Sequence, residues 1–153
     1  MNSVIGQKSP DFMLLDDNGQ AFSSKDLDGA WRIIFFYAKD GSPTCKRGCL
    51  TFKEQYDLFE SAGCKIVGIS KDSVEQHKEF KKELGGLPFP LLSDINGEVS
   101  SLFGVSKLLG TFPSKSSFLV NPENQIVYVY DWLFRPRKHV AQILSKLSLE
   151  VGA

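Results

Sequence analysis

The chain has 153 residues, a formal net charge of zero and 42% hydrophobic residues, which is typical of one globular domain spanning residues 1–153. Balanced charge argues against nucleic acid or an anionic membrane as the main partner, and no apolar run approaches the ~20 residues that span a bilayer. Three cysteines do not make a disulfide scaffold, and the first residues show no basic and apolar leader. We therefore expect a cytoplasmic protein with reduced thiols.

The first part of the chain predicts an N-terminal β-hairpin followed by a central strand. Residues 9–15 and 20–22 have the composition of strands, and residues 16–19, Asp-Asp-Asn-Gly, are typical of a tight turn. A short helical turn is expected over 24–27. Residues 33–37, Ile-Ile-Phe-Phe-Tyr, are continuously apolar, which indicates a strand buried on both faces.

The rest of the chain alternates between helical and strand patterns. Phe52, Tyr56 and Phe59 recur at helical spacing, which predicts a single helix over 43–62 with an aromatic core face. The remaining expected elements are a strand at 64–70, a helix from a Ser73 cap to 84, a short strand at 90–94, a short helix at 97–103, a loop at 106–114, strands at 116–120 and 125–130, and a final helix at 137–149. This order predicts an α/β fold with a central mixed sheet flanked by helices.

The turn after the central strand leads into a helix that carries a cysteine. Ser42 is expected to cap this helix and Pro43 suits its first turn, which also contains Cys45. A helix N-terminus has partial positive charge and unpaired N–H donors, and Lys46 and Arg47 add positive charge nearby. These features favour a lowered thiol pKa, so we predict that Cys45 is reactive rather than a packing residue.

Cys49 lies four residues further along and faces the same side of the helix as Cys45. Their Cβ atoms would lie about 5–6 Å apart in an intact helix. A disulfide needs about 3.8 Å, so the first turn would have to unwind before the two could bond. Gly48 makes unwinding easier, because glycine is a poor helix former. Cys49 is therefore either a second reactive cysteine or a packing residue, whereas Cys64 opens a predicted buried strand and is expected in the core.

Five short segments, taken together and in order, match a known pattern. They are residues 9–12 (Ser-Pro-Asp-Phe), 36–45 (Phe-Tyr-Ala-Lys-Asp-Gly-Ser-Pro-Thr-Cys), 67–70 (Val-Gly-Ile-Ser), 90–94 (Pro-Leu-Leu-Ser-Asp) and 115–120 (Lys-Ser-Ser-Phe-Leu-Val). Over nearly its whole length the chain resembles the peroxiredoxin Q group, also called bacterioferritin comigratory proteins, whose motif reads Phe-Tyr-Pro-Lys-Asp-x-Thr-Pro-Gly-Cys. The resemblance implies a thioredoxin-like fold and a monomer.

The resemblance also implies a thiol peroxidase that needs no cofactor or metal. Cys45 falls on the peroxidatic position, where the family's thiolate attacks hydrogen peroxide or an organic hydroperoxide and becomes a sulfenic acid. A resolving cysteine, here Cys49, then forms a disulfide that thioredoxin or a similar dithiol reduces. Ser42 falls where the family has a threonine that holds the peroxide, and Lys115 where it has an arginine. Backbone N–H groups of Thr44 and Cys45 would supply further donors.

Several positions depart from the family pattern. Ala38 replaces a proline that shields the thiolate, Ser42 keeps the hydroxyl of threonine without its methyl group, and Lys115 keeps the charge of arginine without its planar donor fork. The usual resolving position, five residues after the peroxidatic one, is Leu50 here, and Cys49 is one residue short of it. These departures affect the expected rate more than the fold. A weakened peroxiredoxin that acts as a redox sensor is therefore a second interpretation.

Two further alternatives concern the partners of Cys45. Cys64 or an external thiol could resolve it in place of Cys49. A copper site is also conceivable, because Sco-like copper chaperones share the thioredoxin fold and use Cys-x-x-x-Cys with a distant histidine, and soft thiolates bind Cu(I). His139 would be that histidine, but we expect both His139 and His77 at the surface, which makes copper binding the least favoured interpretation.

Overall fold

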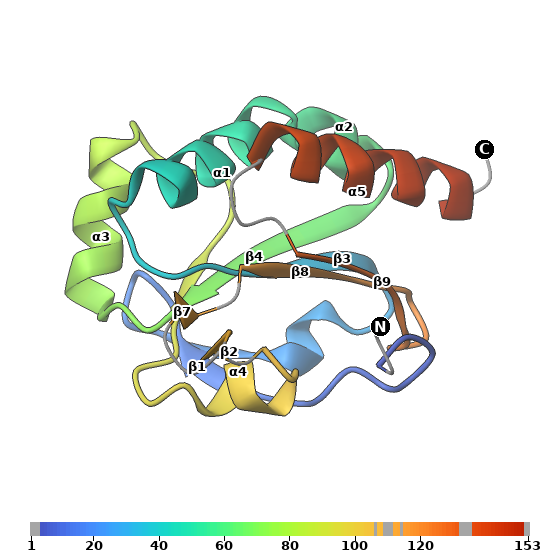
Figure 1. Cartoon of the computed structure of the whole chain (residues 1–153), viewed down its shortest axis with the longest axis horizontal. Helices are drawn as coiled ribbons and strands as arrows, with labels where there is room; N and C mark the ends of the chain where they lie inside the picture. Colours follow the sequence, from blue (N-terminus) through green and yellow to red (C-terminus); the bar gives the residue numbers. More distant parts are fainter. Residues whose placement is uncertain (1–3, 106, 109–111, 114, 132–135, 152–153) are drawn as a thin grey trace.

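A computed structural model describes residues 4–105, 107–108, 112–113, 115–131 and 136–151. At its centre lies a seven-stranded sheet in the order β2-β1-β5-β4-β3-β8-β9 (Figure 1). Its strands are β1 (Met13–Leu15), β2 (Ala21–Ser23), β3 (Trp31–Phe36), β4 (Cys64–Ser70), β5 (Leu91–Ser93), β8 (Ser116–Val120) and β9 (Ile126–Asp131). Strand β4 runs parallel to β3 and β5, and the other neighbouring pairs are antiparallel. The predicted mixed sheet with an N-terminal hairpin is confirmed.

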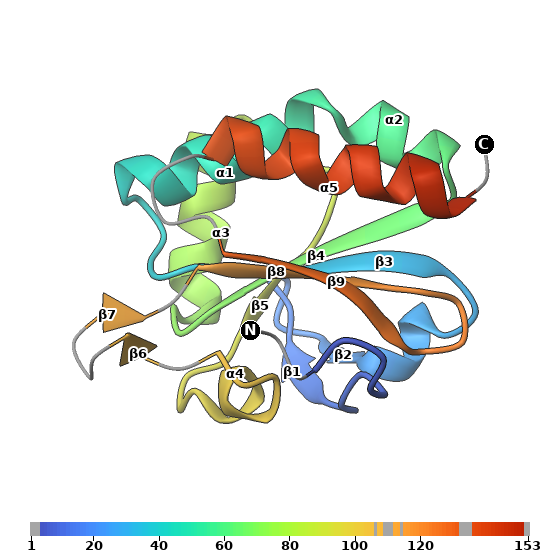
Figure 2. The same cartoon turned by 45° about the vertical axis from the view of Figure 1, so that its right-hand side comes forward.

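Helices lie on both sides of this sheet (Figures 1 and 2). They are the 3₁₀-helix η1 (Ser24–Leu27) and the α-helices α1 (Pro43–Glu54), α2 (Tyr56–Ser61), α3 (Val74–Glu83), α4 (Glu98–Leu102) and α5 (Pro136–Val151). In both views α1, α2 and α5 cover one face of the sheet, and α4 lies beyond the other. None of the helices in the described part of the chain is long and apolar enough to cross a membrane.

Strand β3 is central because both of its faces are apolar. Ile33, Phe35 and Tyr37 belong to the hydrophobic cluster under α1, α2 and α5, whereas Ile34 and Phe36 belong to the cluster on the opposite face. Side chains alternate along a strand, so the continuous apolar run fills two cores at once. Burial of each of these side chains contributes about 1.5–3 kcal/mol. This strand therefore fixes the position of the turn that follows it.

The predicted helix over 43–62 is two helices. At Gln55 the backbone leaves helical geometry (φ −98°, ψ 6°), which ends α1 and starts α2. Phe52 and Phe59 are both fully buried in the same cluster. Residues seven apart fall on nearly one face of a helix, so the aromatic periodicity continues across the break and does not reveal it.

Two other boundaries differ from the sequence-based prediction. Within the expected loop over 106–114, β6 (Lys107–Leu108) and β7 (Phe112–Pro113) form an antiparallel pair, and residues 106, 109–111 and 114 lie outside the described part. Strands of two residues are too short to show alternation. The final helix, α5, begins one residue earlier than expected, at a proline suited to a first turn.

Candidate active site

The site begins where β3 ends and the chain turns into α1. Tyr37 follows β3, and its N–H donates to the carbonyl of Ile69 in β4 at 3.1 Å. Ser42 has an extended backbone, its Oγ accepts the N–H of Cys45 at 3.3 Å, and Pro43 is the first helical residue. The predicted cap is confirmed, and it holds Cys45 in the first turn of α1.

Cys45 and Cys49 lie on the inner face of α1, and both are free thiols. Each is 0% exposed and packs in the hydrophobic cluster that contains Phe35 and Phe52. Burial raises the pKa of Cys49 well above its usual range, and the negative charges of Asp40 and of an ionised Cys45 raise it further. Cys49 is therefore a neutral thiol in this conformation, and it becomes a nucleophile only after a change that exposes it.

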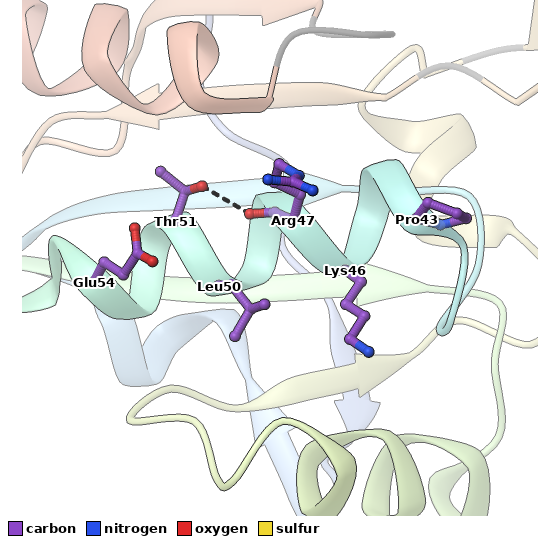
Figure 3. A pocket seen from close by; sticks show the side chains of 6 residues that line it. All are labelled: Pro43, Lys46, Arg47, Leu50, Thr51 and Glu54. Carbon is purple, nitrogen blue, oxygen red and sulfur yellow. Dashed lines mark hydrogen bonds between the residues drawn. The ribbon is translucent and has the colours of Figure 1, made fainter.

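The outer side of α1 forms a shallow pocket (Figure 3). Its lining comes entirely from this helix: Pro43, Lys46, Arg47, Leu50, Thr51 and Glu54. The Thr51 hydroxyl donates to the Arg47 carbonyl at 2.7 Å, and Lys46 forms a 3.6 Å ion pair with Glu83 of α3. Leu50 thus lies on the outer side of α1, whereas Cys49 faces the sheet. Leu50, at the usual family position of the second cysteine, is thus only partly buried at the border of the cluster, whereas Cys49 lies within it.

Cys64 lies at the other end of the sheet. It is the first residue of β4 and pairs with Trp31, the first residue of β3, while Cys45 follows the last residue of β3. Six strand residues correspond to about 20 Å. Burial raises the pKa of Cys64 to about 12, against a smaller opposing effect of Arg32. The prediction that Cys64 is a core residue is confirmed.

The remaining residues predicted from the sequence, Lys115 and Thr44, lie near the end of β3, where the chain turns into α1. Lys115 directly precedes β8, whose first residue, Ser116, pairs with Phe36 at the end of β3. Antiparallel pairing therefore places the Lys115 backbone beside the end of β3. Thr44 is partly buried in the first turn of α1, next to Cys45. All four proposed site residues therefore lie near the end of β3: Lys115, Thr44, Ser42 and Cys45.

Both histidines are buried, so the prediction that they lie at the surface is wrong. His77 and His139 are each 0% exposed. The His139 ring lies 5.3 Å from that of Phe52 and 5.6 Å from that of Tyr130, and its Nε2 shares a hydrogen bond with the Ser117 hydroxyl. Burial lowers the pKa of His139 to about 3. The Ser117 hydroxyl of the sheet gives the buried His139 ring a hydrogen-bond partner. The helical periodicity of the sequence does not show that such a partner exists.

The proposed copper ligands do not come together. Among the residues that the structure describes, the three potential ligands whose atoms lie within 4.8 Å of one another are Asp40, Asp72 and His77. Cys45 and His139 are not part of such a group. This arrangement does not support the copper interpretation. The Asp40 and His77 atoms of the observed group already bond to each other at 2.7 Å, which explains their proximity without a metal.

This group belongs to a hydrogen-bond network behind the turn between β3 and α1. The Tyr37 hydroxyl donates to Asp40 Oδ1 at 2.6 Å, and the N–H of Asp40 donates to Asp72 Oδ2 at 2.8 Å. Sequence reasoning missed the network. The available signal was His77, which lies three residues before the buried Phe80 and therefore on the inner face of α3.

Comparison with known proteins agrees with this arrangement. A sequence model of the AhpC/TSA family matches residues 5–129. The chloroplastic peroxiredoxin Q of Oryza sativa subsp. japonica is 36% identical over 143 residues, which are 93% of this chain and 65% of the rice protein. The chain thus spans slightly less than two thirds of that relative.

Solved structures give the same result. Peroxidoxin BcpB from Mycobacterium tuberculosis has a TM-score of 0.87 and 26% identity, over 97% of this chain and 98% of that one. The bacterioferritin comigratory protein of Xanthomonas campestris, described for its alkyl peroxide reduction activity, has a TM-score of 0.84 and 30% identity over 92% of each chain. The chain therefore belongs to the AhpC/TSA family and has the thioredoxin-like fold of peroxiredoxins. The predicted resemblance to the peroxiredoxin Q group is confirmed.

Proposed function

We propose that the protein is a thiol peroxidase in which Cys45 is the peroxidatic cysteine. The Cys45 thiolate attacks the O–O bond of a hydroperoxide, and its sulfur takes one oxygen to become a sulfenic acid. The other oxygen leaves as an alcohol, or as water when the substrate is hydrogen peroxide. Sulfur loses two electrons and the peroxide gains them. The observation that carries the proposal is the position of Cys45 at the capped start of α1 in an AhpC/TSA chain.

Groups at the start of α1 support this step. The first N–H groups of a helix lack intrahelical partners, so that of Thr44 is available to a bound oxygen anion. The N–H of Cys45 donates to Ser42 Oγ in this structure and turns to the anion only when that bond is exchanged. We propose that these two N–H groups and the Ser42 hydroxyl hold the peroxide and stabilise charge on the leaving oxygen. Lys115, in the position of the family's arginine, adds positive charge at the same edge of the sheet.

We propose that Cys49 resolves the sulfenic acid. Its sulfur attacks the Cys45 sulfur, an S–S bond forms, and the sulfenic oxygen leaves as water. The raised pKa of Cys49 and the helical spacing of the two residues both oppose this attack in the wound helix. Unwinding of the first turn removes both obstacles together, because it exposes Cys49 and lets the sulfurs approach.

The remaining assignments follow the family. We propose that the substrates are hydrogen peroxide and alkyl hydroperoxides, the class in the description of the Xanthomonas campestris relative. The reductant is a thioredoxin-like dithiol, which exchanges with the disulfide and returns both cysteines to thiols. We propose a single-domain monomer. Three free cysteines fit a reducing compartment, for which we propose the cytoplasm.

A slow peroxiredoxin that senses peroxide is the second candidate function. The observation that favours it is the complete burial of Cys45, beside a partly buried Ala38 where the group has proline. A buried thiol meets peroxide only when its neighbours move, which lowers the rate. Steady-state turnover with thioredoxin and thioredoxin reductase separates the candidates, because a sensor reacts once and turns over poorly.

Intact-mass spectrometry tests the chemistry. Reduced wild-type protein treated with one equivalent of peroxide is expected to lose two hydrogens, and Cys64→Ser to do the same. Cys45→Ser is expected to stay unchanged, and Cys49→Ser to gain one oxygen. Absence of any reaction at Cys45 would contradict the peroxidase proposal. A disulfide that persists in Cys49→Ser would contradict only the role of Cys49.

A further inference from the structure

A network of polar side chains lies behind the turn between β3 and α1, and the reaction proposed above does not use it. Its members are Tyr37, Asp40, Ser70, Asp72 and His77. Three partners hold Asp40: Tyr37 donates to its Oδ1 at 2.6 Å, His77 Nδ1 lies 2.7 Å from its Oδ2, and the Asp40 N–H donates to Asp72 at 2.8 Å. The Asp40 side chain is 7% exposed and that of His77 is 0% exposed. Both the backbone and the side chain of Asp40 are therefore fixed.

The contact between Asp40 and His77 contains a shared proton. Nε2 of His77 lies 3.0 Å from the carbonyl oxygen of Leu92, which can only accept, so Nε2 carries a hydrogen. Nδ1 faces Oδ2 of Asp40 at hydrogen-bond distance, and one of these two atoms must hold a proton, since two lone pairs would repel.

Asp40 is also where the fixed part of the turn ends. Gly41 follows with φ of +85°, and no atom lies within 4 Å of the position that a Cβ would take. Ser42 comes next and caps α1 through the N–H of Cys45. A glycine with few conformational restrictions therefore joins the fixed Asp40 to the helical turn that carries Cys45.

We propose that His77 is a positioning residue, which holds α1 in its wound form through Asp40. The inference rests on the proposed function, because it requires Cys45 and Cys49 to bond in an unwound form. In this proposal the unwound form does not keep the contact between His77 and Asp40, so the loss of the contact destabilises the wound form alone. Loss of the partner of a buried oxygen shifts such an equilibrium by about tenfold.

The two steps of the reaction then respond differently. The reduced protein is wound, so a tenfold larger population of a minor unwound form leaves the rate of Cys45 oxidation within about twofold of wild type. Disulfide formation passes through that minor form, so its rate rises about tenfold. Faster capture by Cys49 also protects the sulfenic acid from a second peroxide. The peroxide concentration that converts half of Cys45 to sulfinic acid is therefore expected to rise by a similar factor.

Two amide variants of His77 make a matched pair. The side-chain nitrogen of Asn replaces Nδ1, so His77→Asn keeps a donor toward Asp40. The side-chain nitrogen of Gln replaces Nε2, so His77→Gln keeps a donor toward Leu92 and loses the contact with Asp40. Both variants lose the ring. We expect the tenfold acceleration in His77→Gln and a rate near that of wild type in His77→Asn.

Rapid-quench mass spectrometry measures both steps in one experiment. Tyr37→Phe, which removes the hydroxyl bonds to Asp40 and Ser70, is expected to change disulfide formation in the same direction by less, and it keeps the test valid if His77→Gln does not fold. Ser24→Ala is the stability control, since it removes a buried 2.9 Å bond to the N–H of Phe12 on the opposite face of the sheet. It is expected to lower stability without changing either rate.

The outcomes separate the two proposals. Equal disulfide rates in His77→Gln and wild type, or equal acceleration in His77→Gln and His77→Asn, would overturn the role of His77 while Cys45 remains the peroxidatic cysteine. An acceleration in Ser24→Ala would overturn it too, since loss of stability alone would then be sufficient. Failure of wild-type Cys45 to react with peroxide would overturn the proposed function, and this inference with it.

Discussion

Cys45 and Cys64 are both buried thiols next to the central strands, and we propose opposite roles for them. Cys45 lies in the first turn of a helix, joined to β3 by a turn whose cap is a single 3.3 Å hydrogen bond. Cys64 begins β4, and its backbone is part of the ladder between β3 and β4. Displacement of Cys45 opens one helical turn, whereas displacement of Cys64 opens the middle of the sheet.

The comparison shows that burial alone does not decide which thiol reacts. Both side chains are at most 4% exposed. Local opening costs least where few hydrogen bonds and contacts must break, which is true of helix ends and not of central strands. A thiol that must reach a second cysteine after oxidation is therefore expected in an element that can open without the rest of the fold.

The largest effect is expected from removal of the Cys45 thiol, which tests the proposed difference between Cys45 and Cys64. We expect Cys45→Ser to reduce peroxide consumption to the level without protein, since no other thiol in the chain is placed to react. Cys64→Ser is the matched control and should keep the wild-type rate. Peroxide consumption with excess dithiothreitol measures both, and equal losses in the two variants would break the distinction.

Removal of the second thiol of α1 should have the next largest effect. Cys49→Ser is expected to oxidise at Cys45 at close to the wild-type rate, but thioredoxin-supported turnover should fall by at least about tenfold, because no internal disulfide forms. Overoxidation of Cys45 to sulfinic acid should appear at lower peroxide concentrations. Turnover assays and peptide mass spectrometry report the two effects. Unchanged turnover would assign the resolving role to another thiol.

Cys64 should be visible in the alkaline stability of the fold. Its pKa is about 12 in the folded protein, against 9.0 when exposed. Between pH 9 and pH 12 Cys64 is ionised in the unfolded chain and still protonated in the folded protein. The free energy of unfolding therefore falls as the pH rises, by up to about 1.4 kcal/mol per pH unit from this group. Cys64→Val is expected to have a shallower decline between pH 9 and 10.5 in urea unfolding. A decline as steep as that of wild type would show that Cys64 does not contribute.

The smallest expected effect concerns the cap of α1. Ser42→Ala removes the acceptor of the Cys45 N–H and should cost about 1 kcal/mol of stability. It should also slow Cys45 oxidation, because the same hydroxyl is proposed to hold the peroxide. Ser23→Ala removes the equivalent cap of η1, where Ser23 Oγ accepts the N–H of Lys25. The two variants should unfold alike in urea and differ only in oxidation rate, and equal oxidation rates would contradict a role of Ser42 in the reaction.

The sequence predicted the parts of this site that depend on neighbouring residues. Ser42, Pro43 and Cys45 follow from local rules for helix starts, and the buried strand before them follows from its apolar run. The network around Asp40 could not be predicted in this way, because Asp72 and His77 reach Asp40 from elements more than 30 positions away. The sheet topology creates that contact, and no spacing within the chain reports it.

The break at Gln55 has a consequence for the size of the conformational change. Helix formation is cooperative, so a disturbance at one end of a continuous helix spreads through neighbouring hydrogen bonds until something interrupts them. Gln55 is such an interruption: α1 has 12 residues, and α2 starts afresh behind it with Phe59 buried. The unwinding proposed for the first turn of α1 can therefore stop at this interruption, so that the contacts of α2 with the sheet remain in place.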